Sequence, residues 1–358
     1  MFSDVTVLLT GFAGFIGANL TSELLKRYKG ITIVGIDNMN DYYDVSLKEY
    51  RAGKLSELSS REDTGTLISL CGADISDRKT VDEVFEKYPP SVVVNLAAQA
   101  GVRYSIENPD AYINSNLLGF YNILEACRHS YDDGRQGVAH LVYASSSSVY
   151  GTNKKVPYST DDKVDNPVSL YAATKKSNEL MAHAYSKLYN IPSTGLRFFT
   201  VYGPAGRPDM AYFGFTNKLL EGRKIQIFNY GNCERDFTYI DDIVEGIIRV
   251  MNRPPEKRNG EDGLPIPPYA LYNIGNNHPE NLLDFVDILR QELVRAKVLP
   301  EDYDFDGHME LVPMQPGDVP VTYADTSALE RDFGYKPSTP LRTGLRNFAE
   351  WYKEYYGV

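Results

Sequence analysis

The chain has 358 residues and a formal net charge of −11, with 42% hydrophobic and 24% charged residues. This composition is typical of a globular protein with a large core, and it argues against disorder as the main state. Nucleic acids and membrane surfaces are themselves anionic, so neither is an expected partner. A small anionic ligand would need specific arginines to overcome the acidic field of the whole chain.

Cysteines and histidines give no sign of a disulfide framework or a metal centre. The three cysteines are scattered, and none of them or of the five histidines has the spacing of zinc ligands. No apolar stretch reaches the roughly 20 residues that span a bilayer. We therefore expect free thiols, no metal, and a location in the cytoplasm away from membranes.

Short β-branched runs alternate with helix-like segments in the first half of the chain. The expected strands are 5–10, 31–36, 67–71, 92–96, 141–144 and 194–199, and the expected helices are 16–28, 77–87, 110–129 and 169–189. Such alternation predicts an α/β fold, a doubly wound parallel (Rossmann) sheet with helices on both faces.

The pattern changes after about residue 200. Pro- and Gly-bearing loops separate shorter elements, with helices expected near 241–252, 280–296 and 341–356 and a solvated loop at 253–265. We predict a first domain over 1–200 and a smaller C-terminal α/β lobe over 201–358. This prediction leaves open that some strands and helices within residues 201–358 belong to the first domain.

A glycine-rich segment, T-G-F-A-G-F-I-G, occupies residues 10–17. Gly11, Gly14 and Gly17 follow a predicted strand and open a predicted helix, where glycines let the backbone approach a pyrophosphate at the helix N-terminus. The spacing is G-x-x-G-x-x-G and not the common G-x-G-x-x-G. The segment predicts a bound dinucleotide.

Two acidic residues follow the next strands. Asp37 ends the second predicted strand, about 20 residues beyond the glycines, where a carboxylate accepts hydrogen bonds from the adenosine ribose. The same charge repels a 2′-phosphate, so NAD is favoured over NADP. Asp74 is expected at the end of the third strand, within reach of the adenine.

Tyr171 and Lys175 lie four residues apart, on one face of a predicted helix. A nearby ammonium stabilises a phenolate, as a general base requires. The chain has 27 tyrosines, so the spacing alone is weak evidence. The context selects this pair, because it follows the serine run 145–148 at the end of a predicted strand, where doubly wound sheets bind ligands.

These segments together resemble the extended short-chain dehydrogenase/reductase family and, within it, the UDP-sugar 4-epimerases. The resemblance covers nearly the whole chain. Its motifs are T-G-F-A-G-F-I-G (10–17), N-L-A-A-Q-A-G-V-R-Y-S (95–105), S-S-S-S-V-Y-G (145–151), Y-A-A-T-K (171–175), R-F-F-T-V-Y-G-P (197–204) and R-D-F-T-Y-I-D-D (235–242).

The resemblance implies a catalytic set of Ser146, Tyr171 and Lys175, with Ser147 and Ser148 lining the same pocket. It also implies a set of NAD contacts, all within the predicted first domain. They are Gly11, Gly14, Phe15, Ile16, Gly17, Asp37, Asn38, Asp74, Ile75, Ala97, Ala98, Asn116, Tyr171, Lys175 and Phe199.

For the UDP-sugar substrate, the resemblance implies contacts from Thr200, Arg235 and Asp318. The family often has an arginine three residues before that aspartate, where this chain has Gln315, so the UDP contacts differ there. Relatives that remove water or carbon dioxide carry an acid just before V-Y-G. Here that residue is Ser148, which favours simple redox epimerisation through a 4-keto sugar.

Residues 37–48 and 206–211 are most similar to UDP-glucuronate 4-epimerases. The sugar carboxylate would need a cation, for which Arg207 is the first choice and Arg103 the second. The alternative for Arg207 is a salt bridge within its loop. Thr322 stands where the family limits the pocket size, so UDP-N-acetylglucosamine and UDP-glucose remain alternative substrates.

A non-catalytic NAD-sensing protein on the same fold is the alternative from another functional class. It predicts loss of the tyrosine or the lysine, and both Tyr171 and Lys175 are present. The resemblance further implies a homodimer that pairs the helices near 110–129 and 169–189. A monomer stays open, because apolar positions on those helices also suit packing against the sheet.

Overall fold

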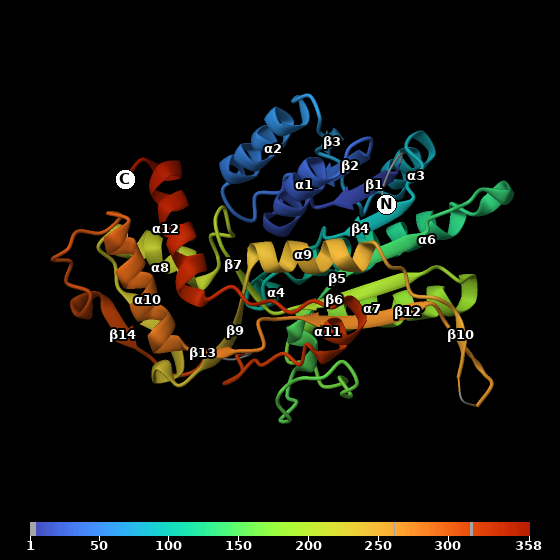
Figure 1. The fold of residues 1–358 in the computed structure, drawn as a ribbon. Coiled ribbons are helices and arrows are strands. Elements are labelled where there is room, and N and C mark those ends of the chain that lie inside the picture. Colours follow the sequence, from blue (N-terminus) through green and yellow to red (C-terminus); the bar gives the residue numbers. More distant parts are fainter. Residues whose placement is uncertain (1–4, 261, 316–317) are drawn as a thin grey trace. The chain divides into compact units, whose positions relative to one another are not determined.

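The computed structural model describes residues 5–260, 262–315 and 318–358 (Figure 1). They form two compact units. The first unit is Met1–Asn153, Lys163–Arg197 and Val244–Tyr272, and the second is Lys154–Asp162, Phe198–Ile243 and Asn273–Val358. The chain thus leaves the first unit and returns to it, with a segment beyond residue 200 joining the N-terminal part.

A seven-stranded sheet, with the strand order β12-β6-β5-β4-β1-β2-β3, organises the first unit. The neighbouring strands of the run β5-β4-β1-β2-β3 pair in parallel. The predicted doubly wound fold class is confirmed. The strands are β1 (Thr6–Thr10), β2 (Thr32–Asp37), β3 (Thr66–Cys71), β4 (Val92–Asn95), β5 (His140–Ser146), β6 (Ser193–Phe198) and β12 (Tyr269–Ile274).

Helices connect these strands and cover the sheet. They are α1 (Phe15–Arg27), α2 (Val45–Ser59), α3 (Arg78–Lys87), α4 (Tyr104–Glu107), α5 (Pro109–Tyr112), α6 (Phe120–His129), α7 (Leu170–Tyr189) and α9 (Ile240–Met251). A short hairpin, β10 (Arg258–Asn259) and β11 (Pro265–Ile266), occupies most of the segment expected to be a solvated loop.

The two faces of the sheet carry different helices. On one face, α3, α6 and α7 contribute apolar residues to a core that includes Leu141 of β5. Side chains alternate between faces along a strand, and the preceding residue, His140, places its Nδ1 3.3 Å from the Met251 backbone oxygen of α9. Arg27 of α1 bonds Glu245 of α9 at 2.5 Å. Helices α1 and α9 therefore cover the opposite face.

Two local features differ from the sequence expectation. Helix α2 was not expected, and its buried residues include Lys48 and Arg51 beside the apolar Leu47 and Leu55. The single helix expected at 110–129 is divided by a π-helical segment, η1 (Ile113–Gly119). Each feature lies next to a loop that the sequence assigns to the dinucleotide.

The second unit contains two small sheets and four helices among its described residues. One sheet has the order β13-β9-β7, with β7 parallel and β13 antiparallel to β9, and the other pairs β14 with β8 in parallel. The strands are β7 (Thr200–Tyr202), β8 (Ile225–Ile227), β9 (Glu234–Tyr239), β13 (Pro279–Asn281) and β14 (Met309–Leu311). The helices are α8 (Ala211–Leu220), α10 (Leu282–Arg295), α11 (Ser327–Phe333) and α12 (Leu341–Tyr356).

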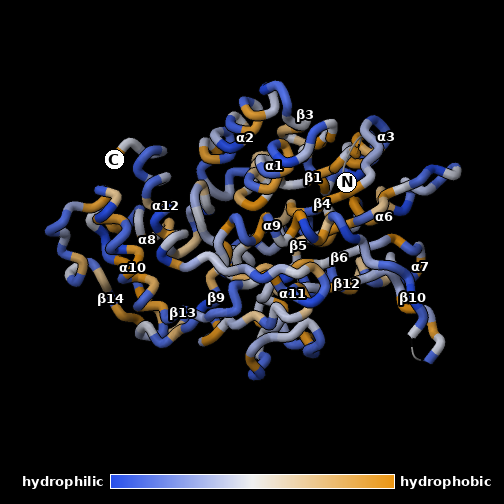
Figure 2. The backbone as a smooth tube through the Cα atoms, viewed as in Figure 1, coloured by the Kyte–Doolittle hydropathy of each residue, from blue (hydrophilic) through white to orange (hydrophobic). Residues whose placement is uncertain are grey.

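Aromatic rings and one buried carboxylate hold the second unit together. The rings of Phe237 and Phe285 stack with centroids 4.4 Å apart, joining β9 to α10. Asp236 is fully buried and accepts hydrogen bonds from the backbone amides of Asn276 and Ala324 at 2.6 and 3.0 Å. Figure 2 shows hydrophobic and hydrophilic residues alternating along α10, as expected of a helix with one buried face.

A buried ion pair joins α7 to the sheet of the first unit. Glu179 and Arg197 are each 1% exposed, and Arg197 Nε and Nη2 donate to the two carboxylate oxygens at 2.8 and 2.9 Å. Burial, the largest single effect, raises the pKa of Glu179, but Arg197, the Ser145 hydroxyl and Lys176 together hold that pKa below its usual value.

Removing this carboxylate should destabilise the protein strongly, because Arg197 would remain charged and buried without its partner. We expect Glu179→Ala to cost about 3–5 kcal/mol. Glu23 on α1 is the matched control, since it pairs with Lys26 and Arg27 at the surface, and Glu23→Ala should cost less than about 1 kcal/mol. Thermal and urea unfolding measure both variants, and equal losses would contradict this account.

Candidate active site

The glycine segment forms a tight turn between β1 and α1. Gly11 has φ +74°, and a Cβ added there would lie 2.9 Å from the Ala97 backbone nitrogen. A Cβ on Gly17 would lie 2.0 Å from the Gly11 oxygen. Gly14 is the N-cap of α1 and provides no side-chain cap. No side chain therefore caps the amides of the first turn of α1, which is the arrangement that binds phosphate groups in other folds, and the contact with a pyrophosphate stays a prediction.

Asp37 closes β2 beside this turn and is 7% exposed. Its Oδ2 accepts a hydrogen bond from the Ala13 amide at 3.2 Å, and its Oδ1 accepts one from the Met39 amide at 2.9 Å. Lys48 Nζ lies 3.8 Å from the same Oδ1. The carboxylate is thus fixed at the strand end by two backbone amides and Lys48, and its contact with the adenosine ribose stays a prediction.

Asp74 lies in the loop three residues after β3, and not at the end of the strand as expected, because β3 ends at Cys71. Its carboxylate accepts hydrogen bonds from Asn38 Nδ2 and the Ser76 amide, both at 2.8 Å. The loops after β2 and β3 are therefore joined through Asn38 and Asp74. Both residues belong to the predicted cofactor set.

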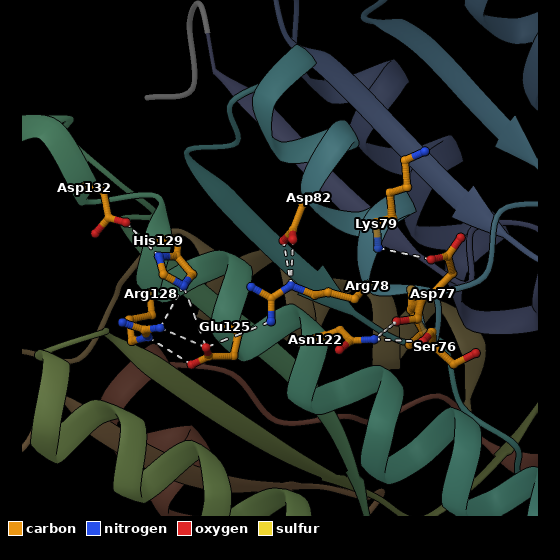
Figure 3. A network of polar contacts seen from close by, with 11 residues as sticks. Ser76, Asp77, Arg78, Lys79, Asp82, Asn122, Glu125, Arg128, His129 and Asp132 are labelled. Carbon is orange, nitrogen blue, oxygen red and sulfur yellow. Dashed lines mark hydrogen bonds and ion pairs between the residues drawn. The ribbon is translucent and has the colours of Figure 1, made fainter.

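Helix α6 anchors the same loop from the other side (Figure 3). Asn122 Nδ2 donates to the backbone oxygens of Ile75 and Ser76 at 2.9 and 3.0 Å. Ile75 is 4% exposed and belongs to the core cluster. A side chain that sequence reasoning missed thus fixes the loop expected to receive the adenine.

The loop after β4 is braced by Asn116 of the π-helical segment. Asn116 Oδ1 accepts a hydrogen bond from the Gln99 amide at 2.8 Å, and its Nδ2 lies 3.0 Å from both the Gln99 oxygen and Thr174 Oγ1. Ala97 donates its amide to Thr10 Oγ1 at 3.1 Å. Asn116 therefore links this loop to α7. Its direct contact with NAD stays a prediction, like those of Ala97 and Ala98.

Of the predicted catalytic residues, Ser146 and Lys175 are held at the end of β5, and Tyr171 lies on the same helix as the lysine. Ser146 is the last residue of that strand, and its Oγ lies 3.1 Å from both the amide and the Oγ of Ser148. Lys175 Nζ donates to the Ala144 backbone oxygen at 2.9 Å, which brings α7 against the strand. Tyr171 lies one turn earlier on α7 and makes an edge contact with the ring of Tyr112, with centroids 6.0 Å apart.

Lys175 is 3% exposed, and burial lowers the pKa of its ammonium to about 8. Among the described residues, no carboxylate lies within ion-pair distance of it. With a pKa of about 8, the Lys175 ammonium begins to lose its proton slightly above neutral pH. In the described part of the chain no carboxylate neutralises its charge. Its charge is available to a neighbouring phenol.

The serines of the run 145–148 differ in their surroundings. Ser145 is 2% exposed and donates its Oγ to Glu179 at 2.7 Å, so its hydroxyl is directed into the protein. Ser146 ends the strand, and Ser147 and Ser148 begin a short 3₁₀ turn. This favours Ser146 or a following serine as the catalytic hydroxyl. Glu179 lies two helical turns after Tyr171, a spacing that sequence reasoning did not use.

Of the remaining predicted substrate residues, Arg103 is the N-cap residue of α4 in the first unit, and the others belong to the second unit. Arg207 bonds the carboxylate of Asp209 in its own loop at 3.0 and 2.5 Å, so a substrate carboxylate would have to displace that partner. Arg235 Nη1 donates to the Glu234 and Pro320 oxygens at 3.0 Å. Phe199 lies between β6 and β7, and Thr200 begins β7. The Asp318 amide donates to the Gln315 backbone oxygen at 3.3 Å.

Two further observations concern the described residues only. No group of three or more His, Cys, Asp or Glu side chains is arranged to hold a metal ion. None of the helices in residues 5–260, 262–315 and 318–358 combines the length and apolar character that crossing a membrane requires.

Comparisons with known proteins agree with this geometry. A model of the NAD dependent epimerase/dehydratase family matches residues 7–275. UDP-glucuronate 4-epimerase 2 of Arabidopsis thaliana is 47% identical over 99% of this chain and 77% of its own length. A probable UDP-glucuronate 4-epimerase of Rhizobium meliloti is 42% identical over 98% of this chain and 97% of its own.

Among solved structures, UDP-glucuronic acid 4-epimerase from Bacillus cereus, in complex with UDP-glucuronic acid and NAD, superposes with a TM-score of 0.80. It is 30% identical, and the match covers 98% of this chain and 100% of that one. The predicted family and the predicted NAD dependence are confirmed. The chain belongs to the NAD dependent epimerase/dehydratase family.

Proposed function

We propose that the protein interconverts UDP-glucuronate and UDP-galacturonate by NAD-dependent epimerisation at C4. The observation that carries the proposal is the contact of Lys175 Nζ with the Ala144 oxygen, which fixes the lysine beside Ser146 and one helical turn from Tyr171. Full-length similarity to proteins named UDP-glucuronate 4-epimerases supports the choice of substrate.

In this proposal Tyr171 acts as the base. As a phenolate stabilised by the Lys175 ammonium, it takes the proton of the C4 hydroxyl, and the Ser146 hydroxyl donates a hydrogen bond to the oxygen that becomes the ketone. The chemistry that NAD supplies when bound is reversible acceptance of the C4 hydride. The 4-keto sugar then rotates within the site so that the opposite face of C4 is reduced. Tyr171 returns the proton to the C4 oxygen in that step.

A 4-keto glucuronate is a β-keto acid, so an epimerase must keep it from losing carbon dioxide. We propose that a cation, Arg207 first and Arg103 second, holds the sugar carboxylate where the breaking bond overlaps poorly with the ketone. Arg235, Asp318 and Thr200 are proposed to bind the UDP and sugar. The Arg207–Asp209 bond supports a variant of this idea in which Asp209 keeps Arg207 oriented until substrate arrives.

We also propose a homodimer through η1, α6 and α7. Apolar side chains on these elements are exposed, including Leu118 (44%), Tyr121 (41%), Leu180 (60%) and Leu188 (68%). A symmetric contact between two copies would cover them, and light scattering measures it. The free thiols of the three cysteines favour work in the reducing cytoplasm.

The reaction and the substrate are tested together. The purified protein is incubated separately with UDP-glucuronate, UDP-glucose and UDP-N-acetylglucosamine, and the products are identified by NMR. We expect C4 inversion of UDP-glucuronate, and Tyr171→Phe should lower kcat by about 10²–10⁴-fold because the base is lost.

Tyr50→Phe is the matched control, since Tyr50 and Lys54 on α2 have the same spacing and Lys54 Nζ lies 6.0 Å from the Tyr50 ring centroid. This variant should keep the wild-type rate. Inversion of only a neutral sugar would replace the proposed substrate. NAD binding without turnover of any of the three would instead indicate an NAD-sensing protein.

The rate should depend on the charge of Lys175. Burial lowers the pKa of this ammonium to about 8, so the cation that stabilises the Tyr171 phenolate is present below that pH and lost above it. We expect kcat/KM for UDP-glucuronate to fall as the pH rises through this region. Lys175→Met should be slow at every pH and lack this alkaline decline. A wild-type rate that stays constant well above the lysine pKa would contradict the role.

The arginine assignment predicts a loss specific to the acidic sugar. Arg207→Met should lower kcat/KM for UDP-glucuronate by roughly 10²-fold, because a charged hydrogen bond to the carboxylate is lost. Its effect on any turnover of UDP-glucose should be small. Arg103→Met is measured beside it, with carbon dioxide release as a second readout. If neither variant changes rate or carbon dioxide release, the carboxylate is held elsewhere.

A further inference from the structure

The loops after β2 and β4 contact each other across the end of β1. In the sheet β1 lies between β2 and β4, and all three are parallel, so their carboxyl ends share one edge. Strands two positions apart are about 10 Å from each other. A direct contact between the two outer loops therefore spans the end of β1, where the glycine segment begins.

Two tyrosines make that contact. Tyr42 follows β2 and Tyr104 begins α4 after β4, and their ring centroids are 4.7 Å apart with an interplanar angle of 46°. Both side chains are partly buried. We call this pair the tyrosine clasp. Aromatic pairs at this distance attract each other beyond the burial of their area.

The β2 side of the clasp is anchored on α2 by buried cations. Lys48 Nζ donates to the backbone oxygen and Oδ1 of Asn40 at 2.9 and 2.8 Å. Arg51 Nη1 donates to the Tyr43 hydroxyl at 2.8 Å and to the Ala13 oxygen at 3.1 Å. The loop that carries Tyr42 is therefore tied to the glycine segment itself.

The β4 side is anchored on the helix segments before η1. Asn108 Nδ2 donates to the Tyr104 hydroxyl at 2.9 Å. Tyr112, which is fully buried, donates its hydroxyl to the backbone oxygens of Ala100 and Gly101 at 2.9 and 2.5 Å. Its ring also meets that of Tyr171. The tyrosine clasp thus connects two loops, after β2 and after β4, that are each held by hydrogen bonds to neighbouring elements.

We propose that the tyrosine clasp closes over the dinucleotide bound at the glycine segment and retains NAD between turnovers. This rests on the proposed function, because an epimerase regenerates NAD in each cycle and has no need to release it. Opening the clasp separates Tyr42 from Tyr104 and leaves both anchors intact. The contact is therefore a barrier to cofactor loss that is separate from the residues that bind the cofactor.

The test measures NAD retention without any UDP-sugar. Protein saturated with NAD is dialysed against NAD-free buffer, and the NAD remaining per chain is quantified over time after denaturation. We expect Tyr42→Ala and Tyr104→Ala each to lose NAD roughly tenfold faster than the wild type, since each removes the same aromatic contact. The double variant should be no faster than either single variant.

Three controls make the result specific. Tyr42→Phe and Tyr104→Phe keep both rings and should retain NAD nearly as the wild type does. Tyr50→Ala removes a tyrosine from α2 that pairs with Lys54 and has no part in the clasp, and it should retain NAD fully. Thermal unfolding of the NAD-free proteins shows whether a variant has lost its fold.

Additive effects in the double variant would mean that the tyrosines act separately, and NAD loss at the wild-type rate in both alanine variants would overturn the clasp. Failure of the proposed function looks different. A wild type that retains NAD through the clasp but does not epimerise UDP-glucuronate would keep this inference and remove the substrate assignment.

Discussion

One buried carboxylate organises the region where chemistry is expected. Glu179 of α7 receives Arg197 from β6 and the Ser145 hydroxyl from β5, and its backbone oxygen accepts the Tyr269 hydroxyl from the start of β12. One residue thus joins a helix to three neighbouring strands. Because a buried charge tolerates little displacement from its partners, the spacing between α7 and the end of β5 is fixed, and with it the position of Lys175.

The first unit repeats this arrangement along the edge of its sheet. Each loop after a strand is held by a polar side chain from a neighbouring element: Asp37 holds the glycine turn, Asn122 holds the loop after β3, and Asn116 holds the loop after β4. These bonds hold the backbone of the loops at the edge of the sheet where doubly wound folds bind their ligands.

Sequence reasoning was strongest where short motifs and periodicity coincide. The glycine turn, Asp37 at the end of β2 and the Tyr171–Lys175 helix could all be found from local spacing. Helix α2 could not, because Lys48 and Arg51 are buried on it and hide the apolar stripe on which helix prediction depends. The π-helical segment was also missed; within it Asn116 bonds Gln99 and Thr174, which are distant in sequence and so leave no local pattern.

The residues of the second unit were predicted from resemblance alone, and nothing in their local pattern specifies a sugar. In the first unit, by contrast, the surroundings of a residue in the sequence indicate its role, and Lys175 is an example. The nearest acid on its helix, Glu179, is already matched by Arg197 and Lys176. Helix α7 therefore keeps a neutralised cluster and an isolated positive charge one turn apart. The positive charge of Lys175 therefore lies one turn from Tyr171 without an ion pair to Glu179, whose two oxygens are bonded to Arg197 and Lys176.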